Sequence, residues 1–479
     1  MTTSIQQLPT IAAIASPIGQ GGVGIIRLSG KDAYRIGCLM TRRSNLIPRM
    51  AHFGGFYGQE GVIDEGVVIY FKAPHSFTGE DVVELQGHGG MVLQNMLLAR
   101  VFELGARQAA AGEFSYRAFE NDKIDLVQAE AISDAISATS VAQATSAIRS
   151  LTGEFSQKIN ELLDRLVHLR LYVEASIDFP EEEDVDFLSD GIIENKLTEI
   201  LSGIDRILAT AKQGQLLRDG VHVVLAGKPN AGKSSLLNRL SGTERAIVTE
   251  IAGTTRDTLE ETLILNGLTV HLTDTAGLRK TDDHVEKIGI KRAFDAIRQA
   301  DVLMMVYDVT TETDPLTLAD QLFCEGVTED VGDIIRQKLI LVANKSDLLV
   351  SKPVLQVSCE TKSAPKLVYV SCETKSAPKL VYVSCETGEG LDELIEILTQ
   401  KVGFHPPENS LIARTRHLDA LNRAKGYAIE AYEQLTIYHA GELVAESLRQ
   451  SQQALGEITG QMSADELLGK IFSSFCIGK

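Results

Sequence analysis

The chain has 479 residues, of which 44% are hydrophobic and 23% charged, an ordinary balance for a soluble globular protein of two or three domains. Its formal net charge of −19 argues against a broad nucleic-acid-binding surface, which would need an excess of Lys and Arg. No apolar run reaches the about 18 residues of a membrane-spanning helix and no secretory signal is apparent, so we expect a cytoplasmic protein whose cysteines are reduced.

Residues 1–122 are rich in glycine and in short alternating apolar runs. Gly24–Leu28 and Gly66–Phe71 are two such runs, and turn-forming residues separate them from their neighbours. Alternation with a period of two is typical of strands that bury one face. We therefore predict a mixed α+β domain over 1–122.

Residues 123–218 and 401–479 show helical periodicity instead. Apolar residues recur there at three- and four-residue spacing, as at Ile159 and Leu162. Neither segment is expected to form a complete hydrophobic core by itself. We therefore predict one discontinuous helical domain, with a domain of residues 219–400 inserted between its two parts.

The central segment alternates strand-like apolar runs with helices, as βαβ units do. Val221–Ala226, Val302–Val309 and Leu339–Ala343 are the clearest runs. Directly after the first, Gly227–Ser234 reads GKPNAGKS and leads into a helix. Two glycines four residues apart, followed by Lys and Ser between a strand and a helix, are typical of a phosphate-binding loop. The pattern predicts a Ras-like P-loop domain of α/β class.

The chemistry of such a loop assigns a role to each residue type. Backbone N–H groups and the helix N-terminus face the phosphate oxygens. Lys233 would reach the β- and γ-phosphates, and Ser234 would ligate Mg²⁺.

Three further segments follow at suitable spacing. Asp274–Gly277 reads DTAG after a strand, where Asp274 suits the outer coordination of Mg²⁺ and Gly277 can offer its N–H to the γ-phosphate. Asn344–Asp347 reads NKSD, and its Asp can accept two hydrogen bonds from guanine that adenine cannot donate. Thr254 and Thr255 lie in the polar loop between the phosphate loop and the DTAG segment, where a threonine would cap Mg²⁺. Together these segments indicate a GTP hydrolase.

Leu278 stands where many small GTPases carry a glutamine that orients water. An apolar side chain cannot polarise water, so another residue must act as the general base. Glu286 is the candidate in the polar stretch that follows, with an ordinary surface residue as the alternative.

Two segments are unusual in composition. The acidic run Glu181–Asp186 is interpreted as a solvated loop rather than a metal site. Val357–Tyr369 is repeated without a difference as Val370–Tyr382, and a third copy starts at Val383 and gives way to Gly388–Gly390. The copies are too short for a solenoid, and each offers the same short strand, so the strand register is ambiguous.

Five segments are distinctive: Gly227–Ser234, Asp274–Gly277 with the following LRKTDDHVEKIGIKRA, FTGEDVVELQGHGG at Phe77–Gly90, GEFSYRAFENDKIDLVQAEA at Gly112–Ala131, and the final Phe475–Lys479. On these segments, and over essentially its whole length, the chain resembles the tRNA-modifying GTPase family called MnmE or TrmE.

The resemblance implies a potassium-dependent nucleotide site. The residues that match its nucleotide contacts are Asn230, Ala231, Gly232, Lys233, Ser234, Ser235, Thr249, Glu250, Ile251, Ala252, Gly253, Thr254, Thr255, Asp274, Thr275, Ala276, Gly277, Asn344, Lys345, Ser346, Asp347, Ser384, Cys385 and Glu386. Mg²⁺ would be held by Ser234 and Thr255. The residues that match the potassium ligands are Asn230, Thr249, Ile251 and Thr254. In the family, K⁺ sits where an arginine finger would, the G domains of two protomers dimerise, and a glutamate matching Glu286 is catalytic.

The resemblance also implies a folate site in the first domain, which in the family dimerises and binds 5-formyltetrahydrofolate. The matching positions are Arg27, Glu84, Lys123 and Lys479. Arg27 and Lys123 suit a ligand with carboxylates, and Glu84 suits the pterin ring. Without the resemblance, each of these would be interpreted as a surface charge.

Cys476 admits two interpretations. The resemblance implies a low-pKa thiol at the modification centre, acting in catalysis. The alternative is a buried structural cysteine. A prenylation tail does not fit: the motif needs two aliphatic residues after the cysteine, whereas Cys476 is followed by Ile, Gly and Lys, and Lys is a poor last residue.

The function that the resemblance implies is a homodimeric, potassium-activated GTPase. It would act with an FAD-dependent MnmG/GidA-type partner, as a heterotetramer, to add a carboxymethylaminomethyl-type group at C5 of the wobble uridine (U34) of certain tRNAs, using a tetrahydrofolate one-carbon donor. A regulatory potassium-dependent switch GTPase in ribosome assembly is the alternative.

Overall fold

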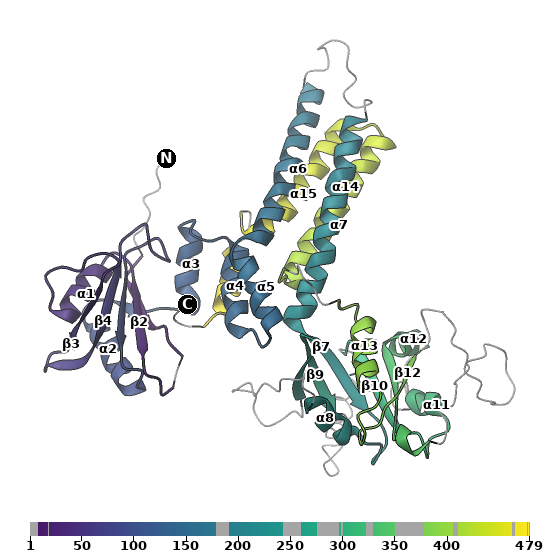
Figure 1. The fold of residues 1–479 in the computed structure, drawn as a ribbon. Coiled ribbons are helices and arrows are strands. Elements are labelled where there is room, and N and C mark those ends of the chain that lie inside the picture. Colours follow the sequence, from purple (N-terminus) through teal and green to yellow (C-terminus); the bar gives the residue numbers. More distant parts are fainter. Residues whose placement is uncertain are drawn as a thin grey trace, which may run out of the picture. The chain divides into compact units, whose positions relative to one another are not determined.

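The computed structural model describes residues 8–17, 19–178, 191–242, 260–274, 297, 300–321, 329–349, 378–405, 411–461, 465–476 and 478. The chain divides into two compact units. Unit 1 comprises residues 1–136, 148–207 and 419–479, and unit 2 comprises residues 137–147 and 208–418. Unit 2 is thus inserted into the sequence of unit 1 (Figure 1).

Unit 1 starts with a six-stranded sheet of order β3-β4-β5-β2-β1-β6. The strands are β1 (Ile11–Ile14), β2 (Gly24–Ser29), β3 (Ala51–Tyr57), β4 (Val62–Phe71), β5 (Val82–Gly87) and β6 (Arg107–Gln108). Neighbours are antiparallel except β1 and β6, which are parallel. Along β4 buried and more exposed residues alternate, as expected of a sheet with one covered face.

Two helices cover the buried face of this sheet. They are α1 (Ala33–Thr41) and α2 (Met91–Glu103). Ile36 of α1 and Leu97 of α2 are buried in one cluster with Leu28 and Leu85 of the strands. The mixed α+β character predicted for this part of the chain is confirmed.

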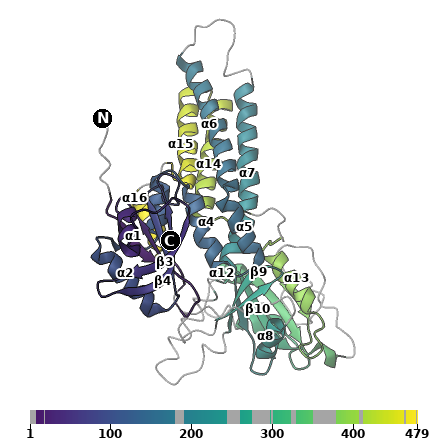
Figure 2. The same ribbon diagram turned by 60° about the vertical axis from the view of Figure 1, so that its left-hand side comes forward.

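The rest of unit 1 is helical. Its helices are α3 (Glu113–Glu120), α4 (Leu126–Ser137), α6 (Glu154–Asp178), α14 (Thr415–Thr436), α15 (Gly441–Thr459) and α16 (Asp465–Ser473), with parts of α5 (Val141–Leu151) and α7 (Ile192–Asp219). The long helices α6, α7, α14 and α15 lie side by side (Figures 1 and 2). Leu166 of α6 and Leu448 of α15 are fully buried, and Tyr432 Oη donates 2.7 Å to Glu194 Oε1, which joins α14 to α7. The bundle therefore combines segments more than 200 residues apart, as the discontinuous helical pattern predicted.

Unit 2 is an α/β domain around a six-stranded sheet of order β12-β11-β10-β7-β9-β8. The strands are β7 (Val221–Ala226), β8 (Glu260–Leu265), β9 (Leu268–Asp274), β10 (Val302–Asp308), β11 (Leu339–Asn344) and β12 (Lys379–Tyr382). All neighbours are parallel except β8 and β9. The carboxyl ends of the parallel strands therefore meet at one edge, where α/β proteins bind ligands.

Both faces of this sheet are covered, which explains the nearly continuous apolar runs of its strands. On one face lie α8 (Lys233–Ser241) and α13 (Leu391–Lys401), and on the other α11 (Pro315–Ala319) and α12 (Glu329–Lys338). Val223 faces the first pair with Leu236 and Leu394, whereas Val224 faces the second with Leu318.

Unit 2 includes residues 137–147, 208–218 and 401–418 besides 219–400, so it is larger than the span expected from the sequence. Gln143 fixes residues 137–147: its amide nitrogen donates to Leu217 O (2.7 Å) and to Thr269 Oγ1 (3.0 Å). Because Gln143 is buried, these hydrogen bonds satisfy a polar group that would otherwise be costly. Among the helices that the structure describes, none is both long and apolar enough to span a bilayer.

Candidate functional sites

The phosphate-binding loop connects β7 to α8 at the carboxyl edge of the unit 2 sheet. Lys233 is the first residue of the helix and is buried, and its ammonium donates to Gly227 O (2.8 Å) and Lys228 O (3.1 Å). Ser234 and Ser235 follow, exposed at the helix N-terminus, as is Asn230 in the loop. The lysine side chain thus folds back over the loop and contacts two of its carbonyl oxygens, at the position where a phosphate-binding loop holds its lysine.

Asn344, at the end of β11, links the loop to the NKSD segment. Its amide nitrogen donates 2.9 Å to Ala231 O, and its amide oxygen accepts from Lys345 N (2.8 Å). Gly232 has a left-handed φ of +95°, and a Cβ there would lie 2.0 Å from the Asn344 nitrogen. A side chain at residue 232 would therefore displace the Asn344 amide that joins the two motifs.

The remaining NKSD residues follow in a short 3-10 turn, Ser346–Leu348. Asp347 is exposed, as a carboxylate that is to receive guanine must be, and Ser346 is buried. Lys345 Nζ donates 2.6 Å to Asp308 at the end of β10. Burial alone would raise the pKa of Asp308, but the hydrogen bond from Lys345 keeps it below its ordinary value.

Ser384–Glu386 lie next to the NKSD segment. Val383 N donates to Ala343 O (2.8 Å), and Ser346 N donates to Val383 O (3.1 Å). Cys385 is half-buried, and its pKa is raised by burial. Among the described residues, the start of the third copy, Val383–Thr387, therefore lies at this edge.

Part of the predicted nucleotide site lies outside the described residues. Asp274 ends β9, opposite Leu225 of β7 in the strand register, and so reaches the same edge of the sheet. Outside the described part of the chain are Thr249, Glu250, Ile251, Ala252, Gly253, Thr254, Thr255, Thr275, Ala276, Gly277 and Glu286, together with the acidic run Glu181–Asp186.

Sequence reasoning missed one contact of the phosphate loop. Lys228 Nζ donates 2.6 Å to Glu312, which follows β10. The hydrogen bond from Lys228 keeps the pKa of Glu312 below its ordinary value. Nothing in the spacing signals this pair, because strand order alone brings the β7 and β10 ends together.

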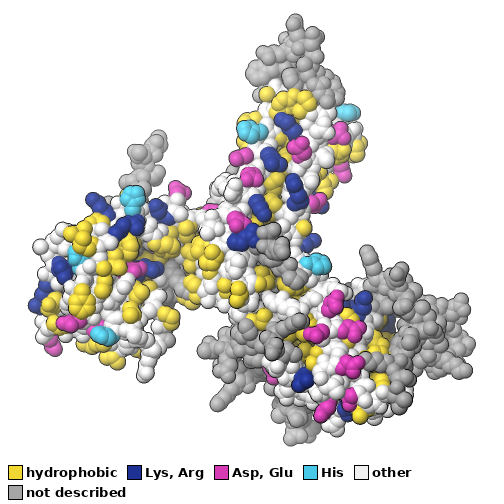
Figure 3. Space-filling model, viewed as in Figure 1, with side chains coloured by type: hydrophobic (Ala, Val, Ile, Leu, Met, Phe, Trp, Pro, Cys, Tyr) yellow, Lys and Arg dark blue, Asp and Glu magenta, His cyan; other side chains and the backbone are white. Residues whose placement is uncertain are grey.

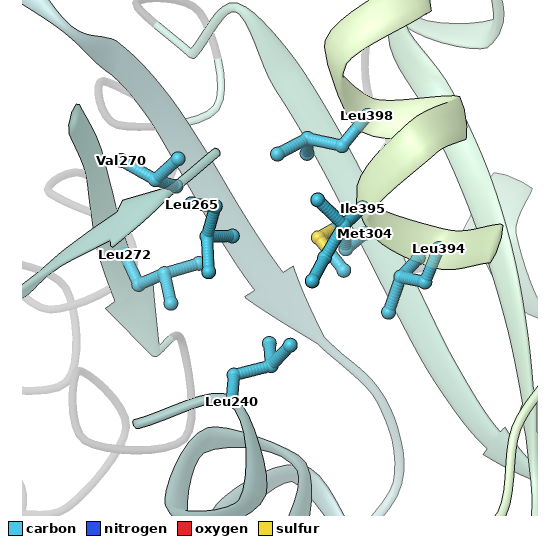
Figure 4. A pocket seen from close by; sticks show the side chains of 8 residues that line it. All are labelled: Leu240, Leu265, Val270, Leu272, Met304, Leu394, Ile395 and Leu398. Atoms are coloured by element: carbon cyan, nitrogen blue, oxygen red, sulfur yellow. The ribbon is translucent and has the colours of Figure 1, made fainter. Parts of the chain in front are cut away.

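A cavity of about 10 Å³ lies between the unit 2 sheet and the helices α8 and α13 (Figure 4). Its lining is wholly apolar and includes Leu240, Val270, Met304 and Leu394. A space the size of one water with no polar partner stays dry. The cavity belongs to the core and binds nothing polar.

A second group of predicted residues meets in unit 1. Arg27 of β2 stands opposite Glu84 of β5, and its Nε donates 3.0 Å to Glu84 Oε1. The guanidinium also lies 5.9 Å from the ring centres of Phe77 and Phe114. Arg27 therefore has an anionic partner and two aromatic neighbours at a partly exposed position, a combination suited to a ligand with both a ring and negative charge.

Lys123 lies close to the loop between β4 and β5, the loop that carries Phe77. Its ammonium is exposed and donates 2.9 Å to Pro74 O, while its stem lies close to Gly79. Lys123 and Arg27 thus each lie close to the loop between β4 and β5, which carries Phe77.

The chain end also reaches this sheet. Gly112 N donates 3.3 Å to Cys476 O, directly before α3, and Phe472 and Phe475 pack in one buried cluster with Leu126. A Cβ on Gly478 would lie 2.3 Å from Ile14 O of β1. The Cys476 side chain is exposed, which disagrees with the interpretation as a buried structural cysteine. Lys479 falls outside the described residues.

A buried ion cluster that the sequence did not signal supports this arrangement. Arg117 of α3 is 1% exposed and pairs with Glu80 (2.9 Å) and Glu113 (2.9 Å). Burial alone would raise the pKa of Glu113, but hydrogen bonds from Arg107, Ala110 and Arg117 lower it to about 2. Because Glu80 ends the loop that carries Phe77, Arg117 fixes that loop to the helix beside the chain end.

Comparison with known proteins agrees with these observations. The family model described as MnmE helical domain matches residues 126–476, and the model described as GTP-binding protein TrmE N-terminus matches residues 10–123. A tRNA modification GTPase MnmE of Psychrobacter arcticus is 66% identical over 100% of this chain and 98% of that protein. The one of Acinetobacter baylyi is 56% identical over 99% and 98%.

Among solved structures, the G domain of the FeoB iron transporter of T. maritima is 27% identical and covers 38% of this chain and 98% of that one. Its TM-score is 0.25, so it adds nothing to the assignment.

A mostly parallel sheet with a phosphate loop after its first strand and an NKSD segment after β11 defines a P-loop GTPase domain. The helical bundle and the N-terminal sheet flank that domain in the sequence. The chain belongs to the MnmE family of tRNA modification GTPases.

Proposed function

We propose that the chain is a potassium-activated GTPase that modifies the wobble uridine, U34, of certain tRNAs. With an FAD-dependent MnmG/GidA-type partner it would add a carboxymethylaminomethyl-type group at C5, with a tetrahydrofolate as the one-carbon donor. GTP hydrolysis would drive G-domain dimerisation and a rearrangement of the protein. The proposal includes a cytoplasmic homodimer that forms a heterotetramer with the partner.

The observation that carries the proposal is the contact between Cys476 and Gly112. Gly112 precedes α3, and the ring of Phe114 in that helix lies against Arg27. A thiol and a cation suited to folate carboxylates are thus linked through one short segment. A ribosome-assembly switch GTPase would use the nucleotide site alone and would leave this second site without a role.

In the nucleotide site, Ser234 and Thr255 would hold Mg²⁺, and Asn230, Thr249, Ile251 and Thr254 would hold K⁺. The exposed hydroxyl of Ser234 and amide of Asn230 supply the oxygen atoms that such cations prefer. K⁺ would supply positive charge near the β- and γ-phosphates. Lys233 would exchange its two carbonyl partners for phosphate oxygens, and Glu286 would orient the attacking water.

The potassium proposal is tested by GTP turnover in KCl and in NaCl at equal ionic strength. We expect turnover to be roughly tenfold or more faster in KCl, and Asn230→Ala to abolish the difference. Asn238→Ala is the matched control, an exposed asparagine on α8. Equal rates in the two salts, with Asn230→Ala unchanged, would exclude potassium activation.

The role of Cys476 is tested by nucleoside analysis of tRNA from cells that carry Cys476→Ser. The contact to Gly112 uses the backbone oxygen, so it survives the substitution, and loss of the modified uridine reports on the thiol itself. Cys38→Ser, in the first domain away from this site, is the control. Normal modification in Cys476→Ser cells would show that the thiol is not catalytic.

Folate binding is tested by equilibrium dialysis of 5-formyltetrahydrofolate. We expect Arg27→Ala to weaken binding about tenfold or more, because a charge-assisted contact is worth about 1.5–3 kcal/mol. Arg35→Ala, an exposed arginine of α1, should bind as the parent does. Unchanged binding by Arg27→Ala would remove Arg27 from the site.

Dimerisation through the first domain is supported by its exposed apolar side chains. Phe53, Val62 and Val92 are more than half exposed, at 68%, 56% and 73%. Figure 3 shows hydrophobic side chains over the visible face of this domain. Analytical ultracentrifugation of Phe53→Asp and Val92→Asp tests this: a dimer in both variants would exclude these surfaces from the interface.

A further inference from the structure

The three Ser-Cys-Glu-Thr segments compete, by sequence, for the loop beside the guanine-selecting residues. They are Ser358–Thr361, Ser371–Thr374 and Ser384–Thr387. In the structure β12 is Lys379–Tyr382, the end of the second copy, and the third copy follows it directly. The two earlier segments lie outside the described residues.

The third copy is held by the backbone of β11 and by the NKSD segment. Val383 N donates to Ala343 O, which extends the parallel pairing beyond β12. Cys385 N lies 3.4 Å from Asn344 Oδ1, the same side chain that bonds the phosphate loop. The backbone of Cys385 is therefore part of the hydrogen-bond network that joins the phosphate loop to the base-selecting segment.

The turn that closes this loop requires glycine. Ser384 N donates to Glu389 O (3.0 Å), and Gly388 N donates to Ser384 O (2.8 Å). Gly388 and Gly390 have left-handed φ angles of +86° and +79°. A Cβ on Gly390 would lie 1.9 Å from Tyr382 O, a backbone atom of β12. Any side chain at residue 390 must therefore displace the strand.

The requirement for glycine at these two positions excludes the second copy of the repeat, Val370–Tyr382, from forming this loop. Moving the pairing back by one copy, 13 residues, would put Lys375 in the place of Gly388 and Ala377 in the place of Gly390. Alanine would bring the Cβ into contact with the strand carbonyl, and both residues would have to adopt a conformation that L-residues avoid. The identical strand residues leave the register open, and the turn after them fixes it.

We infer that Ser384–Thr387 alone forms the guanine loop, that the Cys385 thiol is shielded when guanine nucleotide is bound, and that one copy of the repeat is dispensable for this site. The inference rests on the proposed nucleotide site. It assigns Cys385, and neither Cys359 nor Cys372, to the neighbourhood of the base.

The first test is alkylation with N-ethylmaleimide, with and without GDP, read by mass spectrometry. Cleavage at Lys and Arg separates the three cysteines, because they fall in different peptides that end at Lys362, Lys375 and Lys401. With GDP at 100 times its Kd, we expect Cys385 to react up to about 100-fold more slowly, and the other two at unchanged rates. Protection of Cys372 instead of Cys385, or equal protection of both, would overturn the inference.

GDP affinity, measured separately with a fluorescent GDP analogue, distinguishes a failure of the proposed nucleotide site from a failure of the assignment of Cys385. If GDP does not bind, the proposed nucleotide site fails and the inference fails with it. If GDP binds but Cys385 reacts at its unprotected rate, the nucleotide site stands and the inference alone is wrong.

The second test uses backbone variants. Gly390→Ala should weaken GDP binding about tenfold or more, because the base loop is displaced. Gly403→Ala is the matched control: Gly403 has a similar φ of +67° at the end of α13, but no atom lies within 4 Å of a Cβ there. Deletion of residues 357–369 should leave the GDP Kd within roughly twofold. A strong loss of binding on that deletion, or no difference between the two glycine variants, would contradict the inference.

Discussion

The two units hold their sites together with different kinds of buried group. In unit 2 a neutral amide, Asn344, joins the phosphate loop, the NKSD segment and the third repeat copy. In unit 1 a charged guanidinium, Arg117, joins the loop of Phe77 to α3. Removing a partner from a neutral buried amide costs a modest amount of folding free energy, whereas removing a partner from a buried charge costs more. The contacts of Asn344 should therefore cost less to break than those of Arg117.

The largest effect on stability is expected when the buried charge of Arg117 is removed. Arg117→Met should destabilise unit 1 by about 3–5 kcal/mol, because Glu80 and Glu113 lose their partner inside the protein. Hydrogen exchange of peptides from residues 107–121 measures the effect in the whole chain. Arg423→Met, which breaks the exposed pair with Glu457, is the control and should cost about 0–1 kcal/mol. Equal effects of the two variants would contradict the fixed role of Arg117.

Lys233→Ala tests whether the folded-back lysine serves the nucleotide or only the loop. GTP turnover should fall about 100- to 1,000-fold, since a charge directed at the phosphates is lost. Phosphate release measures it. Lys228→Ala, which removes the neighbouring exposed ion pair with Glu312, should change turnover little.

Asn344→Ala tests the neutral amide that joins the phosphate loop to the NKSD segment. It leaves Ala231 O without its donor, so GDP binding should weaken by about 1–3 kcal/mol, roughly 5- to 150-fold, as measured by calorimetry. The fold should survive, and the hydrogen exchange of unit 1 peptides should stay unchanged. A loss of stability as large as that of Arg117→Met would remove the distinction between the two buried groups.

A further effect, on stability, is expected from pH. The pKa of Glu113 lies at about 2 in the folded chain, below its ordinary value of 4.5. Its contribution to stability is therefore complete above pH 4.5 and is lost as the pH falls from 4.5 toward 2. Urea unfolding of the parent and of Glu113→Gln over this range isolates the effect. The difference between the two proteins should shrink as the pH falls, and a constant difference would contradict the lowered pKa.

The nucleotide motifs were predictable because each is contiguous. GKPNAGKS places Lys233 and Ser234 at a helix start through local geometry alone, and the NKSD segment ends a strand in the same way. Helical periodicity likewise predicted the discontinuous bundle. The contacts of Lys228 and Arg117 could not be predicted, since they depend on which strands and loops become neighbours.

By itself the sequence determined the class of the protein, the nucleotide motifs and the alternation of helix and strand, since these are local patterns of residue type. The tertiary structure decided which distant residues meet. It brought Arg27 opposite Glu84, placed Cys476 beside Gly112, and placed Val383, at the start of the third repeat copy, beside the NKSD segment. The physical reason is that such contacts depend on strand register, packing and the backbone space around a few glycines, which identical short segments cannot encode on their own.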